Sequence, residues 1–129
     1  MLFQSSVKRF GFSDLKIKDK WLFSFVLKNG RRINSPNFFV YVLLKDDVDL
    51  FKFGISINRN IAKAAIRNKI KRILREFFRL NRERIIDRIV FVVKPKPECK
   101  IRKYKELEDE FNKIFIKENL FKDNRPSMD

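Results

Sequence analysis

Apolar residues recur along the chain with two different periods, which predict its helices and its strands. Spacings of three and four residues predict helices over about 13–28, 59–82 and 102–117. Ser13 or Asp14 is expected to cap the first helix, and Asn29-Gly30 to end it. In the second helix the apolar stripe consists of Ile66, Ile70, Ile73, Leu74, Phe77 and Phe78.

Segments rich in aromatic and β-branched residues are predicted to be strands, at 38–45, 51–58 and 89–93. The second of them alternates in character, with Phe53, Ile55 and Ile57 on one face and Lys52, Gly54, Ser56 and Asn58 on the other. Because a helix joins the second strand to the third, these two strands are expected to pair in parallel. The predicted fold is a small α/β or α+β sandwich.

The helix predicted over 59–82 has a strongly basic face. It carries a single acid, Glu76, and nine basic residues, which are Arg59, Lys63, Arg67, Lys69, Lys71, Arg72, Arg75, Arg79 and Arg82. At about 100° per residue, the side chains opposite the apolar stripe are those of Asn68, Arg72, Arg75 and Arg79, with Arg67 and Lys71 on one flank and Lys69 on the other. A solvated helix face usually mixes acids and bases, so this one-sided charge indicates a surface for phosphate groups.

The composition indicates one folded domain with a polyanionic partner. The chain has 129 residues, 44% of them hydrophobic, with fifteen Phe and a net charge of +15. One domain is predicted over 14–119, between flexible tails at 1–13 and 120–129. Nucleic acid is the first candidate partner because so much positive charge repels itself in a compact fold; an anionic membrane surface is the second.

Few residues of this chain could perform catalysis. It has no His and one Cys, Cys99, which we interpret as incidental, and it has no glycine-rich phosphate-binding loop. Asp46, Asp47 and Asp49 could hold a divalent metal in a stand-alone nuclease, but a solvated hairpin turn is the favoured interpretation. We therefore predict no catalytic side chain, no metal site and no organic cofactor. No apolar run is long enough to span a bilayer, and residues 1–12 lack the charged, apolar and small-residue pattern of a signal peptide, so a cytoplasmic protein without a membrane partner is expected.

Two aromatic residues have an ambiguous role at this point. Phe23 on the first predicted helix and Tyr41 on the first predicted strand could stack on unpaired bases, or they could both be core residues.

The basic helix and the strand before it resemble the signature of the bacterial ribonuclease P protein subunit. The matching segments are 54–60, GISINRN, and 64–76, AAIRNKIKRILRE. The turn at 28–32, the aromatic strand from 38 and the strand at 89–95 are also similar to the family, so the resemblance covers about 15–119. The family pattern is not matched everywhere: Lys69 replaces the second Arg of an Arg-Asn-Arg motif, and other departures occur at Leu27, Asn60, Ala62 and Val93.

This resemblance implies a fold and a function. The fold is an α/β sandwich in which a mixed four-stranded sheet carries packed helices in the order αβββαβα, with a left-handed βαβ crossover as in the second domain of ribosomal protein S5. The function is that of a protein subunit of an endoribonuclease whose RNA subunit, using Mg²⁺ bound mainly through the RNA, removes the 5′ leader of precursor tRNA. The expected partners are that catalytic RNA and precursor tRNA, with one protein monomer in each complex.

The resemblance also implies two sets of site residues. The helix residues that contact the catalytic RNA are Arg67, Asn68, Lys69, Lys71, Arg72, Arg75 and Arg79. The residues of a cleft for the leader are Phe23, Tyr41, Ser56, Asn58, Arg59 and Lys63. A general or ribosome-associated RNA-binding protein of the same fold is the alternative.

Overall fold

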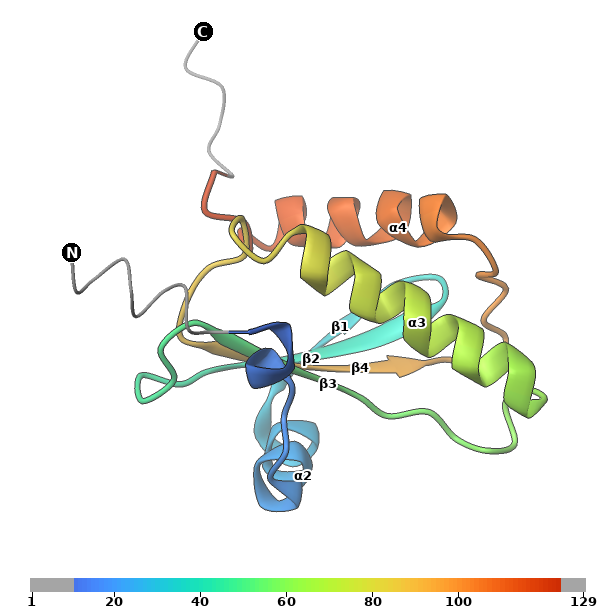
Figure 1. Ribbon diagram of the computed structural model, residues 1–129, viewed down its shortest axis with the longest axis horizontal. Coiled ribbons are helices and arrows are strands. Elements are labelled where there is room, and N and C mark those ends of the chain that lie inside the picture. Colours follow the sequence, from blue (N-terminus) through green and yellow to red (C-terminus); the bar gives the residue numbers. More distant parts are fainter. Residues whose placement is uncertain (1–10, 124–129) are drawn as a thin grey trace, which may run out of the picture.

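Four strands form one mixed sheet that carries helices on both faces (Figure 1). The computed structural model describes residues 11–123. Its elements are a 3-10 helix η1 (Phe12–Leu15), α2 (Lys20–Asn29), β1 (Arg31–Asn34), β2 (Phe38–Leu44), β3 (Phe51–Ile55), α3 (Ala64–Leu80), β4 (Ile89–Pro95) and α4 (Tyr104–Lys117). After η1, this order confirms the predicted α+β arrangement.

The strands lie in the order β1-β2-β4-β3. β2 pairs antiparallel with both β1 and β4, whereas β3 pairs parallel with β4. The parallel pair requires a crossover, which α3 provides. Figure 1 shows α3 and α4 together on one face of the sheet and α2 alone on the other.

The larger core fills the space between the sheet and the pair α3 and α4. Alternate residues of the strands point into it, among them Val40, Phe53 and Phe91, all at most 1% exposed. They meet the apolar stripe of α3, in which Phe78 stacks on Phe53 with ring centroids 4.4 Å apart. Ring contacts of this kind run through the whole core, which accounts for much of the phenylalanine in the sequence.

A smaller core lies under α2, on the opposite face of the sheet. Leu22 and Val26 of the helix pack there with Val48, Val90 and Val92. Phe23 and Tyr41 are partly buried against the same cluster. The sheet is therefore covered on both faces, but much more thickly on the α3 side.

The first long helix begins later than the predicted residue 13. Asp19 caps it, since its side chain accepts a hydrogen bond from the Trp21 backbone N–H at 2.9 Å. The segment just before the cap pairs with the edge of β3 instead, where Ile17 N donates to Phe53 O at 2.8 Å. β3 itself ends at Ile55, three residues before the predicted end, and the chain then turns toward α3.

The packed core also includes residues beyond 119, the predicted end of the domain. Leu120 and Phe121 are each only 3% exposed, and Phe121 forms a bridge with Ile85. The prediction that the tail begins at residue 120 is therefore wrong for these two residues. The rest of the predicted tails, at 1–10 and 124–129, lies outside the described residues. Between residues 11 and 123, no helix combines the length and the apolar character needed to cross a membrane.

Candidate nucleic-acid interface

α3 separates its apolar and basic residues onto opposite faces, as predicted. Ile70, Ile73, Leu74, Phe77 and Phe78 are buried. Asn68, Lys69, Arg72 and Arg79 are exposed, while Lys71 and Arg75 are partly buried on the side toward β3. No acid lies in the first turn of the helix, so its positive end adds to the charge of these side chains.

Arg67 does not project into solvent with the other basic residues. Its Nη1 donates to the backbone carbonyl of Arg59 at 2.8 Å and also to that of Ala62. These bonds hold the loop between β3 and α3 against the first turn of the helix. Arg67 is thus placed to fix the position of the loop.

Arg79 is exposed but is not a free cation. Its Nε and Nη2 donate to the two carboxylate oxygens of Glu76, at 3.0 and 2.7 Å. This bidentate bond lowers the pKa of Glu76 and raises that of Arg79. The single acid of α3 therefore offsets the last basic residue of the helix and leaves the middle of its basic face unopposed.

A basic pocket of about 260 Å³ lies at the outer edge of β3, where α2 and α3 approach it from the two faces of the sheet. Lys71 and Arg75 line it from α3, and Lys16 lines it from the segment before α2. Phe23 and Gly54 contribute the apolar wall. Among residues 11–123 no carboxylate lines this pocket, so it combines positive charge with an aromatic ring.

Phe23 and Tyr41 both lie on the α2 side of the sheet but not side by side. Phe23 packs on Gly54 of β3. Strand register places Tyr41 next to Val92, and Val92 next to Gly54, so Tyr41 is two strands away from Gly54, about 10 Å. On the other side of Tyr41 lies Arg32 of β1. This row of residues crosses the sheet from the pocket to the opposite edge.

The remaining predicted cleft residues follow β3 in sequence. Ser56 continues the strand, its N–H donating to Val93 O at 2.9 Å. Asn58 shapes the next turn, because its Oδ1 accepts from Asn60 N at 2.9 Å. Arg59 and Lys63 are exposed on the loop that Arg67 holds. The structure therefore unites Phe23 with Lys71 and Arg75 and places Asn58, Arg59 and Lys63 on the approach to α3.

Two further features of this surface were not predicted. Lys16 lines the basic pocket only because its segment bridges to β3, a long-range contact without a local sequence signal. Phe39 lies on the same face of β2 as Tyr41, and the cations of Arg32 and Lys96 each lie 4.8 Å from its ring centroid. The period-two alternation of β2 could have indicated Phe39, since it lies two residues before Tyr41.

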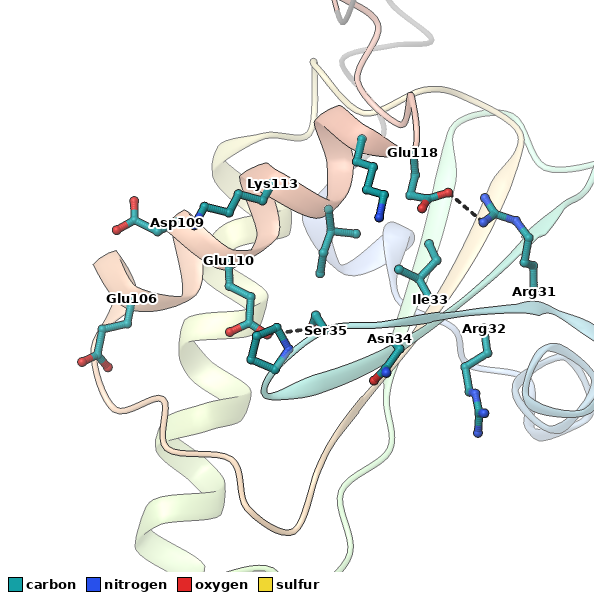
Figure 2. Close-up of a pocket in the computed structure, with 13 residues that line it drawn as sticks. Arg31, Arg32, Ile33, Asn34, Ser35, Glu106, Asp109, Glu110, Lys113 and Glu118 are labelled. Carbon is teal, nitrogen blue, oxygen red and sulfur yellow. Dashed lines mark hydrogen bonds and ion pairs between the residues drawn. The ribbon is translucent and has the colours of Figure 1, made fainter.

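A larger pocket, of about 530 Å³, lies between β1 and α4 and has a different character (Figure 2). Its charged residues are balanced, with Arg31, Arg32, Lys113 and Lys117 against Glu106, Asp109, Glu110 and Glu118. Glu110 accepts hydrogen bonds from Ser35 Oγ at 2.6 Å and from the Asn37 backbone N–H at 2.9 Å, so it ties the β1–β2 turn to α4. Four carboxylates make this pocket unsuitable for a phosphate group.

The aspartates after β2 form a surface turn. Asp47 pairs with Lys45 at 2.9 Å, and this contact lowers its pKa. Among residues 11–123, no three His, Cys, Asp or Glu side chains gather closely enough to hold a metal ion. Cys99 is buried, and the loss of solvent raises the pKa of its thiol.

Comparison with known proteins connects this arrangement to one family. The family model described as "Ribonuclease P" matches residues 13–119. The ribonuclease P protein component of Staphylococcus epidermidis is 33% identical over 82 residues, which is 64% of this chain and 71% of that protein.

Solved structures agree with the sequence match. A mutant of the Staphylococcus aureus RNase P protein superposes with a TM-score of 0.77 at 25% identity, over 94% of this chain and 98% of that one. The Thermotoga maritima RNase P protein shares the fold, with a TM-score of 0.68 at 24% identity over 77% and 93% of the two chains. The chain therefore belongs to the ribonuclease P protein family, the protein components of a ribonucleoprotein endoribonuclease.

Proposed function

We propose that this chain binds a catalytic RNA and the 5′ leader of precursor tRNA, and so assists the removal of the leader. The observation that carries the proposal is the pocket in which Lys71 and Arg75 of α3 meet Phe23 of α2. Cations beside a partly buried aromatic ring that lines the same pocket suit a single strand, because they can neutralise phosphate while the ring contacts a base. The exposed middle of α3, with Asn68, Lys69 and Arg72, is assigned to the catalytic RNA.

In this proposal the chain contributes binding and the RNA contributes the chemistry. Hydrolysis of a phosphodiester requires activation of water, and the residues described here offer neither imidazole nor a group of carboxylates for a metal. The Mg²⁺ that the reaction uses would be held mainly by RNA phosphates. By lowering repulsion between two polyanions, the protein would reduce the Mg²⁺ concentration that the reaction requires. The proposed compartment is the cytoplasm, and the proposed complex contains one protein monomer and one RNA.

Reconstitution tests this function directly. Ribonuclease P RNA transcribed from the same genome is incubated with precursor tRNA at low Mg²⁺, with and without the protein. We expect the 5′ leader to be released only when the protein is present. A variant with both Arg72→Ala and Arg75→Ala should give much less product at equal protein concentration. A protein that binds RNA without restoring cleavage would favour the general RNA-binding alternative.

A second experiment tests the role of Phe23. We expect Phe23→Ala to weaken binding of precursor tRNA to the holoenzyme about tenfold, which is a common loss for one base stacked on an aromatic ring, and to leave binding of mature tRNA unchanged. Leu44→Ala is the matched control, because Leu44 is 74% exposed and is not among the described residues that line the pocket. Equal losses for both tRNA forms would show that Phe23 acts only in the packing of α2.

A further inference from the structure

A second cation-lined hollow lies on the other flank of α3, facing the start of α4. It has a volume of about 530 Å³. Basic residues enter it from two separate segments: Lys69 and Arg72 from α3, and Arg102 and Lys103 from the turn before α4. Ile73 and Tyr104 form its less polar wall.

The positive charge of this hollow is not neutralised by the acids near it. Glu76 is the single acid among the described residues that line it, and Arg79 already binds both of its oxygens. The balanced pocket in Figure 2 has equal numbers of acids and bases, whereas here the bases are four to one. An anion entering this hollow would therefore meet an excess of positive charge.

The hollow is formed by side chains rather than by the end of a helix. The backbone N–H groups of Arg102 and Lys103 donate to Glu106 Oε1 at 3.0 and 3.1 Å, so α4 caps its own first turn. The guanidinium of Arg102 is oriented by the carbonyl of Ile101, to which its Nη1 donates at 2.8 Å. One cation is thus fixed in place before any ligand arrives, which reduces the entropy lost on binding.

We propose that this hollow binds a phosphodiester of the RNA partner, so that the RNA interface crosses α3 and continues onto the start of α4. The inference rests on the proposed function, because it takes the anion to be RNA. With the Lys71–Arg75 pocket on one flank and this hollow on the other, α3 forms a ridge with a cationic depression on each side. Arg102 and Lys103, which lie outside the basic helix, thereby become RNA contacts.

Lys103 and Lys105 allow a closely matched test. Both are exposed lysines, two positions apart, but Lys105 faces Glu108 and Asp109, each 3.4 Å from its Nζ. Binding of transcribed ribonuclease P RNA to the full chain is measured over a series of salt concentrations. Lys103→Gln should reduce the slope of log K against log salt by about 0.7–0.9, the amount expected for one lost phosphate contact. Lys105→Gln should leave the slope unchanged.

Arg75→Gln, on the opposite flank of α3, separates this inference from the proposed function, which assigns Arg75 to the leader. Its readout is the salt slope of precursor tRNA binding to the holoenzyme. A reduced slope in that measurement, together with a normal slope of ribonuclease P RNA binding for Lys103→Gln, would overturn the inference and leave the function standing. Normal slopes for both variants would overturn both.

A cleavage reagent attached to the protein tests independently whether residue 103 lies next to the bound RNA. Cys99 is buried, so a thiol introduced by Lys103→Cys can be labelled selectively with an iron chelate that generates hydroxyl radicals. We expect discrete cuts in the bound RNA, and much weaker cuts from the Lys105→Cys control. Equal cutting from both positions, or none from Lys103→Cys, would contradict a contact at the hollow.

Discussion

The ring of Phe23 lies against the backbone of Gly54, so closely that a β-carbon at residue 54 would fall 2.7 Å from Cε2 of the ring. Glycine is therefore required here by space and not by backbone conformation, since no glycine among the described residues has a positive φ. The contact fixes the height of α2 above the edge of β3. It also places the aromatic wall of the basic pocket.

Gly54→Ala should consequently destabilise the protein by displacing Phe23. We expect a loss of about 1–3 kcal/mol in the free energy of unfolding, as for other overpacked sites, measured by urea denaturation. Gly11→Ala is the control, because the nearest atom to its new β-carbon would be 3.7 Å away. In the double variant with Phe23→Ala the added methyl group should have little further effect, and additive losses would contradict the proposed clash.

Arg67 is expected to affect RNA binding through the loop that it holds. Arg67→Ala removes two hydrogen bonds to the carbonyls of Arg59 and Ala62, so amide hydrogen exchange should accelerate in residues 59–63. RNA affinity should fall as well. In Arg72→Ala, by contrast, affinity should fall while exchange in the loop stays normal. Unchanged exchange in Arg67→Ala would mean that the side chain contacts RNA directly.

Glu76→Gln should strengthen RNA binding, because it releases Arg79 from its ion pair. An affinity gain of about twofold to fivefold is expected at low salt, and it should shrink as salt screens the charges. The ion pair of Glu76 with Arg79 also sets how binding depends on pH. Because the fold lowers the pKa of Glu76, the ion pair is fully formed above the usual titration range of a glutamate. It is lost as the pH falls through the lowered pKa of Glu76. Wild type should therefore approach the affinity of Glu76→Gln in acid. Weaker binding by Glu76→Gln at neutral pH would contradict this account.

Glu110→Ala is expected to damage stability without changing RNA binding. The carboxylate accepts from Ser35 Oγ and from both the backbone and the side-chain N–H groups of Asn37. Loss of these bonds at a partly buried site should cost about 2–3 kcal/mol in thermal or chemical unfolding. Under conditions where the variant is folded, its RNA affinity and salt slope should equal those of wild type. A change in the slope would place the β1–α4 pocket in the interface.

The helix α3 could be predicted from the sequence because its apolar residues recur every three or four positions from Ile66 to Phe78. The start of α2 was missed for a physical reason: the segment containing Lys16 and Ile17 bridges to β3 through a backbone hydrogen bond, and this long-range pairing outweighs the local helix signal. The same limitation applies to Arg67, whose helical position indicates an outward side chain but whose donors are satisfied by the preceding loop. The pair of Arg79 with Glu76, three residues apart on one helix, could have been predicted from spacing alone.

The unequal cores on the two faces of the sheet have a consequence for motion. α3 and α4 are anchored by the aromatic cluster, whereas α2 is held by a small group around Leu22 and Val26. The free energy needed to lift α2 is therefore smaller than that needed to unfold the domain. Under the proposed function, a strand entering beside Phe23 would widen its own binding site by tilting this one helix, while the basic ridge of α3 would keep its shape. In the proposed function, the protein would thus combine a rigid surface for a structured RNA with an adjustable one for a strand of variable sequence.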